Sequence, residues 1–116
     1  MANIYTQQGK TDEAIHAFKT LLSINPFDTE AHYCMGVLYG QKNMFEESIY
    51  ECKRALEIDP DKAKAHYTLA VTYFYLNRLE LSWNHLKNAQ RLNYKIRPEF
   101  LKNLKIARLE QQKKGY

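Results

Sequence analysis

The sequence predicts an all-α fold made of repeated pairs of antiparallel helices. Three observations indicate this fold: one sequence pattern returns at a fixed interval, small and apolar residues follow helical spacing, and glycine and proline are scarce, with 4 and 3 copies in 116 residues. The composition, 45% hydrophobic and 26% charged, is ordinary for a globular domain and excludes a disordered tail or a collagen-like rod. The chain has room for one domain and contains no apolar run long enough for a membrane span.

The repetition has a period of 34 residues. When residues 29–60 are placed on residues 63–94, ten of the 32 positions are identical. Residues 9–26 placed on residues 43–60 agree at six of 18 positions. A fixed period of this length is typical of an array in which each unit buries its apolar face against its neighbours.

Each repeating unit is predicted to hold two helices. In residues 45–58, Ser48, Cys52 and Ala55 follow i, i+4, i+7 spacing, and this spacing places small or apolar side chains on one helix face. Residues 79–92 show an equivalent face. We expect helices near residues 1–8, 11–24, 28–41, 45–58, 62–75, 79–92 and 97–113.

The breaks between these helices fall at residues that favour them. Within the units they fall at Gly9, Asn43 and Asn77, residue types that tolerate the left-handed backbone at a helix end. Between the units they fall at Asn25-Pro26 and Asp59-Pro60, because proline cannot continue the preceding helix.

The 34-residue helix-turn-helix unit resembles the tetratricopeptide repeat. In the second unit, Gly36, Tyr39, Ala55 and Pro60 match the residue types that this family prefers. The third unit keeps the matching residues Leu69, Tyr73 and Ala89, and the first keeps Tyr5, Gly9, Ala14, Phe18 and Pro26. The resemblance departs at His32, His66, Ser48, Ser82, Cys52 and Leu86, and at Tyr94, where proline is expected.

The resemblance implies a right-handed α-solenoid organised as one domain. A partial first unit covers residues 1–28, with a truncated opening helix, and complete units cover 29–62 and 63–96. Residues 97–116 then form a polar capping helix of the kind that such arrays need. Phe100, Leu101, Leu104 and Ala107 supply the apolar face with which this helix docks on the third unit.

In this family the first helix of each pair lines a concave surface, so the resemblance implies a non-catalytic protein-interaction module. We expect a helix or extended segment of a partner protein to bind there. The surface is aromatic in its middle and basic toward the C-terminal end, which favours an acidic or carboxylate-bearing partner. The predicted groove residues are Tyr33, Val37, Gln41, Lys64, Tyr67, Thr68, Val71, Phe74, Tyr75, Lys102, Lys105 and Arg108. The alternative for Tyr67 and Phe74 is partial burial between neighbouring helices.

Two other modes of interaction stay open. The short opening helix leaves apolar surface that a second copy of the chain or upstream repeats would cover, which allows homo-oligomers. The basic last helix allows binding to nucleic acid, although a net charge of +4 is a weak signal for it. The carboxylate clamp found in one subclass of the family is disfavoured: Asn3 and Lys64 match it, but Cys34 and Thr68 replace its asparagine and arginine.

No residue pattern indicates catalysis, a metal site or a cofactor. The sequence has no nucleophile elbow, phosphate-binding glycine loop or HExxH motif. Of the four histidines, His32 and His66 occupy equivalent positions, and His16 and His85 are expected to be surface residues. The two cysteines are expected to be reduced helical thiols. No signal peptide is visible after Met1, so we expect a cytoplasmic protein unless a targeting segment lies upstream of Met1. We expect no small-molecule substrate.

Overall fold

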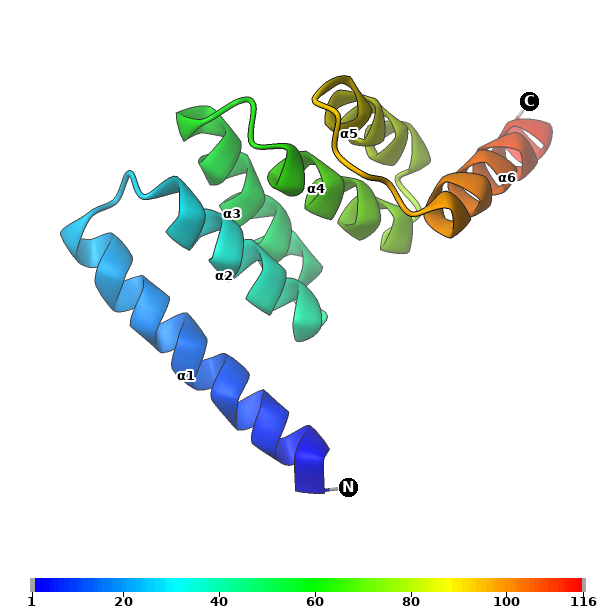
Figure 1. Ribbon diagram of the computed structural model, residues 1–116. Helices are drawn as coiled ribbons and strands as arrows, with labels where there is room; N and C mark the ends of the chain where they lie inside the picture. Colours follow the sequence, from blue (N-terminus) through cyan, green and yellow to red (C-terminus); the bar gives the residue numbers. More distant parts are fainter. Residues whose placement is uncertain (1, 116) are drawn as a thin grey trace. The chain divides into compact units, whose positions relative to one another are not determined.

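The computed structural model describes the backbone of residues 2–115 and the side chains of residues 9–114. It contains six helices and, over the described residues, no strand: α1 (Ala2–Ile24), α2 (Thr29–Gln41), α3 (Phe45–Ile58), α4 (Ala63–Tyr75), α5 (Leu79–Arg91) and α6 (Pro98–Gly115) (Figure 1). Residues 1–62 and 63–116 form two compact units, called unit 1 and unit 2 below. The predicted all-α fold of antiparallel helix pairs is confirmed. None of the described helices has the length and apolar character needed to cross a membrane.

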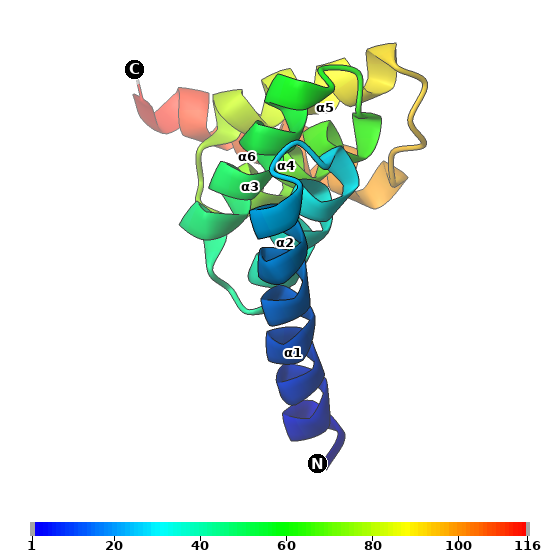
Figure 2. The same cartoon turned by 90° about the vertical axis from the view of Figure 1, so that its left-hand side faces the viewer.

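The prediction of a helix break at Gly9 is wrong, because α1 is one helix of 23 residues. Gly9 does not adopt a left-handed backbone, and an added Cβ there would meet no atom within 4 Å. Figures 1 and 2 show the N-terminal part of α1 running on beyond α2. A turn at this point holds only if the helix before it packs back on the helix after it, and the tolerance of glycine for a left-handed backbone does not by itself supply that packing.

The breaks predicted at Asn43 and Asn77 are confirmed. Their φ angles are 61° and 59°, in the left-handed region. The following amide closes each helix end: Met44 N donates to Tyr39 O at 2.9 Å, and Arg78 N donates to Tyr73 O at 2.9 Å. Asn93, with a φ of 64°, ends α5 in the same way and was not predicted. The proline breaks are also confirmed, since α1 ends at Ile24 and α3 at Ile58.

Within each unit, a buried serine joins the two helices of a pair. Ser48 Oγ donates to Gly36 O at 2.7 Å, and Ser82 Oγ donates to Ala70 O at 2.6 Å. Both serines are fully buried, so these bonds form away from competing water. The small residue facing each serine lets the two backbones approach closely, as the repeat pattern predicted.

Each unit has its own apolar core. The core of unit 1 lies between α1 and α2 and is centred on Ile15, Met35 and Tyr39. The core of unit 2 is centred on Ala70, Leu79, Leu86 and Leu104. Leu104 of α6 is wholly buried there, and full burial of a leucine side chain contributes about 1.5–3 kcal/mol. The predicted docking face of the last helix is therefore confirmed.

Candidate functional site

In unit 1, the predicted binding residues lie along α2 beside a charged cluster. Tyr33 and Val37 are half-buried, and Gln41 is exposed. The Lys62 ammonium lies 5.2 Å from the centre of the Tyr33 ring and 2.5 Å from Glu30 Oε2. Tyr33 therefore presents a ring whose position a cation helps to fix.

Cys34 lies next to this cluster and is half-buried. Its Sγ is 3.8 Å from Glu30 Oε1. Partial burial, and then the negative charge of Glu30, raise the pKa of the Cys34 thiol above its ordinary value. Burial raises the pKa of Cys52 to about 12. Both cysteines are free thiols, and neither has the lowered pKa that covalent catalysis requires.

In unit 2, Tyr67 and Phe74 of α4 belong to an aromatic cluster that also includes Tyr94 and Phe100. The Tyr67 ring centre lies 5.3 Å from that of Tyr94 and 5.7 Å from that of Phe100. Phe74 meets Phe100 edge to face at 5.5 Å. Because both α4 residues are half-buried against the core of unit 2, only part of each ring is available to a partner.

The other predicted residues of α4 differ in their accessibility. Tyr75 is 68% exposed, and Lys64 is exposed at the start of the helix. Thr68 and Val71 are half-buried, and the Thr68 hydroxyl donates to Lys64 O at 2.9 Å. Of this group, Tyr75 and Lys64 have the most surface to offer to a partner.

Along α6 the structure has an open hollow of about 410 Å³. Its lining consists of Pro98, Leu101, Lys102, Lys105 and Ile106. The two lysines are exposed, and neither has an ion-pair partner among the described residues. The hollow therefore combines an apolar surface with two available cations, as an acidic and partly apolar segment requires.

Arg108 is separate from these lysines because its guanidinium is engaged with α5. Its Nε and Nη2 atoms donate to the two carboxylate oxygens of Glu80 at 3.0 and 3.1 Å. The guanidinium also lies 4.4 Å from the centre of the Trp83 ring. A bidentate, stacked arginine holds α6 against α5, and little of its charge is free for a partner.

The two equivalent histidines are buried and have different partners. His32 Nδ1 is 2.8 Å from Glu51 Oε1, and His32 Nε2 is 2.8 Å from Pro26 O. His66 Nδ1 is 3.1 Å from His85 Nδ1, and the His85 ring stacks on Tyr73 at 5.7 Å. His85, which was expected at the surface, is half-buried, and His16 is exposed as predicted. The described residues contain no group of three or more side chains that could hold a metal ion.

Sequence reasoning missed two contributors to the structure of unit 2. Tyr94 completes the aromatic cluster, and the signal for it was the replacement of the expected proline. Trp83 supports Arg108, and nothing in the repeat pattern distinguishes its position. Asn3, assigned to the disfavoured carboxylate clamp, lies outside the side chains that the structure describes.

Comparison with known sequences and structures gives a consistent result. The sequence profile described as TPR repeat matches residues 2–43 and 38–77. No curated protein matches the chain.

Several solved structures share the fold. The first TPR of Spaghetti (RPAP3), bound to an HSP90 peptide, has a TM-score of 0.80 and 21% identity, over 95% of this chain and 86% of that one. The TPR2B domain of yeast Sti1, in a complex with pHsp70, has a TM-score of 0.70 and 19% identity, and the match covers 78% of this chain and 73% of the Sti1 domain chain. MamA of AMB-1 has a TM-score of 0.69 and 29% identity. This match covers 77% of this chain and 53% of the MamA chain.

Proposed function

The chain belongs to the tetratricopeptide repeat family, and we propose on this basis that it is a non-catalytic protein-interaction module that binds a helical or extended segment of a partner protein. The solved structures of the RPAP3 and Sti1 domains are complexes with chaperone-derived ligands, which supports this class of function. The proposed binding residues are those predicted on α2, α4 and α6, with the exception of Arg108.

The observation that carries the proposal is the hollow beside α6. It places Lys102 and Lys105 next to the apolar side chains of Leu101 and Ile106. Exposed Tyr75 adds a rigid ring with a hydroxyl group on α4 of the same unit. This chemistry suits a segment with an apolar side chain flanked by carboxylates, because it offers contact area together with the ammonium groups of Lys102 and Lys105.

A selected peptide tests the proposal. We would isolate ligands from a displayed peptide library and measure their Kd by fluorescence anisotropy. We expect the double variant Lys102→Gln/Lys105→Gln to bind about tenfold more weakly and Tyr75→Ala about fivefold more weakly, because each removes exposed contacts without opening the core. The matched control is Lys113→Gln/Lys114→Gln, which removes the same charge from the far end of α6. Equal losses in both double variants, or no loss in either, would contradict the proposal.

A second candidate function, self-association, is favoured by the exposure of α1. The core-facing positions Ser48, Cys52 and Ala55 of α3 are fully buried. Their repeat equivalents on α1 are Ala14 and Phe18, which are half-buried, and Leu21, which is 39% exposed. Sedimentation equilibrium from 10 µM to about 1 mM tests this candidate: a dimer that Leu21→Glu abolishes supports it, and a strict monomer throughout contradicts it.

A further inference from the structure

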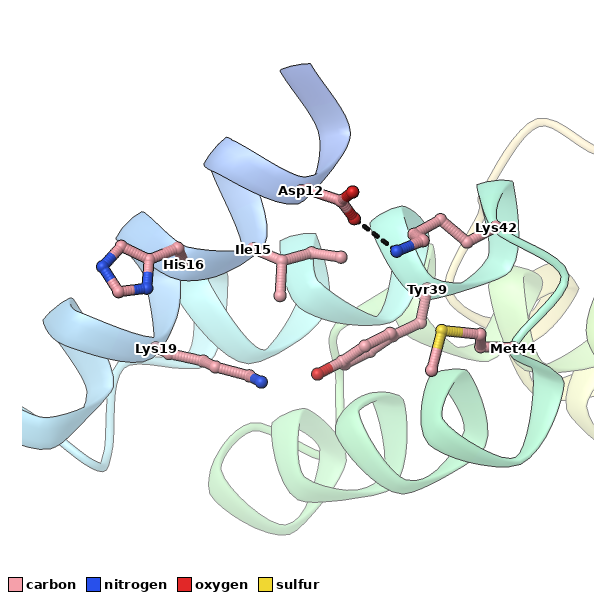
Figure 3. Close-up of a pocket in the computed structure, with 7 residues that line it drawn as sticks. All are labelled: Asp12, Ile15, His16, Lys19, Tyr39, Lys42 and Met44. Carbon is pink, nitrogen blue, oxygen red and sulfur yellow. Dashed lines mark hydrogen bonds and ion pairs between the residues drawn. The ribbon is translucent and has the colours of Figure 1, made fainter. Parts of the chain in front are cut away.

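Unit 1 contains a second hollow, which the proposed partner-binding residues do not include. It has a volume of about 280 Å³ and is bounded by α1, by the end of α2 and by the turn before α3. Its lining consists of Asp12, Ile15, His16, Lys19, Tyr39, Lys42 and Met44 (Figure 3). The hollow is at the small end of the range for ligand sites, so it suits a single residue or a small molecule rather than a long segment.

The charges around this hollow favour an anion. Lys42 forms an ion pair with Asp12, which neutralises the only carboxylate among the lining residues. Lys19 and His16 have no ion-pair or side-chain hydrogen-bond partner among the described residues. The lining residues therefore carry a net positive charge, which comes from the ammonium group of Lys19, and they also include the imidazole group of His16.

The Tyr39 hydroxyl adds a donor at the same place. The Tyr39 residue is only 9% exposed, and its hydroxyl has no protein partner among the described residues. Every fully buried polar side-chain atom in the described part of the chain has a hydrogen-bond partner. Because the Tyr39 hydroxyl has none, it is not fully buried and is accessible from the hollow that the residue lines. Figure 3 shows the Lys19 ammonium and the Tyr39 hydroxyl pointing toward one another, with the Asp12–Lys42 pair on the other side.

Apolar side chains complete the surface between these polar groups. Ile15 is 7% exposed and belongs to the core of unit 1, and Met44 is half-buried beside that core. Methionine is a flexible side chain that adapts to the shape of a bound apolar group. The hollow thus has donors on one side and an adaptable apolar surface next to them.

We propose that this hollow is a binding site for a carboxylate carried on an aliphatic body, as in a C-terminal leucine or a free branched acid. The carboxylate accepts hydrogen bonds from the Lys19 ammonium and the Tyr39 hydroxyl, and the aliphatic group packs against Ile15 and Met44. A carboxylate is favoured over a neutral group because charge-assisted hydrogen bonds are stronger than neutral ones. The site lies wholly within unit 1 and stands independently of the α6 hollow.

Methyl and aromatic NMR titrations test the proposal with defined probes. The probes are N-acetyl-leucine, its primary amide, and the peptide acetyl-Gly-Gly-Leu with a free C-terminus. We expect saturable shifts at Ile15, Tyr39 and Met44, with the acid binding about fivefold more tightly than the amide. Tighter binding of the peptide than of N-acetyl-leucine assigns the site to a chain terminus, and equal or weaker binding of the peptide assigns it to a free acid.

Two variants test the assigned donors. Lys19→Gln should weaken binding of the acid about fivefold and leave binding of the amide unchanged. Tyr39→Phe keeps the ring in the core and should weaken the acid about twofold to threefold. The matched control is Lys10→Gln, which removes the same charge from an exposed position of the same helix. The proposal is overturned if no saturable shift occurs, if acid and amide bind equally, or if Lys10→Gln weakens binding as much as Lys19→Gln does.

Discussion

The helix pairs α2–α3 and α4–α5 share one framework but fill it differently. Both have the buried serine bonded to a backbone carbonyl and the left-handed asparagine between the helices. They differ at the contact beside the serine, where Gly36 faces Cys52 in one pair and Ala70 and Leu86 occupy the equivalent positions in the other. The smaller residue of one helix pair thus faces a side chain that differs in size from its counterpart in the other pair.

The buried histidines differ between the same two pairs. Glu51 and His85 occupy the same repeat position, 34 residues apart, and each contacts the buried histidine of its own unit. An ionised carboxylate only accepts hydrogen bonds, whereas an imidazole ring can donate or accept according to its tautomer. One substitution at one repeat position therefore changes the kind of partner that the buried ring meets while leaving the helix pair in place.

The largest expected effect comes from emptying the core position on the second helix of each pair. Leu86→Ala should lower the free energy of unfolding by about 2–5 kcal/mol, because it leaves a cavity at a fully buried site. Cys52→Ala removes a single buried atom at the equivalent position and should cost about 1 kcal/mol. Urea unfolding followed by circular dichroism measures both. Equal losses in the two variants would contradict the cavity explanation, which predicts the larger loss where more buried atoms are removed.

The next effect comes from adding a methyl group to the small position. A Cβ on Gly36 would lie 2.5 Å from Cys52 Sγ and 3.3 Å from Ser48 O, so Gly36→Ala should destabilise by about 1–3 kcal/mol despite the better helix propensity of alanine. The double variant Gly36→Ala/Cys52→Ala removes the sulfur and should recover part of this loss. If the double variant is less stable than the sum of the two single changes, the explanation through the sulfur atom fails.

Much of this architecture could be predicted from the sequence, for identifiable reasons. The ends of α2 and α4 followed from Asn43 and Asn77, whose position in a regular repeat marked them as helix ends. Gly9 occupies the same repeat position but continues the helix, because tolerance of a left-handed backbone does not enforce it. A turn also needs the contacts that bring two helices together, and the repeat position alone does not guarantee them.

The side chains of the candidate site were less predictable than the helices. The exposure of Tyr75 and the lysines of α6 followed from their helical positions. The engagement of Arg108 with Glu80 depended on a long side chain that can reach either side of its helix. The His66–His85 contact depended on which helix faces meet. His16 and His85 are both histidines, so the residue type alone could not tell that only His85 lies on a face that meets another helix.

Removing the partner of each buried histidine sharpens the comparison. Glu51→Ala and His85→Ala should each destabilise by about 1–2 kcal/mol at neutral pH, because each takes a hydrogen-bond partner from a buried ring nitrogen. Urea unfolding followed by circular dichroism measures both losses, and a variant as stable as the unchanged protein would contradict the role assigned to that contact.

The smallest effect on stability, but a clear one on reactivity, concerns the thiols. At pH 8, a disulfide reagent should modify Cys34 more slowly than a free thiol and should leave Cys52 unmodified until the protein unfolds, because both pKa values are raised and Cys52 is fully buried. The pKa of Cys52 is higher in the folded protein, at about 12, than in the unfolded chain, at about 8.5. Its contribution to the free energy of unfolding is therefore fully present below about pH 8.5 and is lost as the pH rises toward about 12. Cys52→Ala should reduce the loss of unfolding free energy at alkaline pH, and a pH profile of stability identical to that of the unchanged protein would contradict this role of Cys52.

The serine-to-carbonyl bonds have a consequence for how this chain can change over time. Each bond joins residues twelve positions apart, and both bonds recur at the same place in the 34-residue period. A gene duplication or deletion of one full period therefore keeps donor and acceptor at this spacing wherever it begins, whereas an insertion or deletion of another length between the two residues separates them. This arrangement favours growth and shrinkage of the array in whole units and lets surface positions on each copy diverge freely.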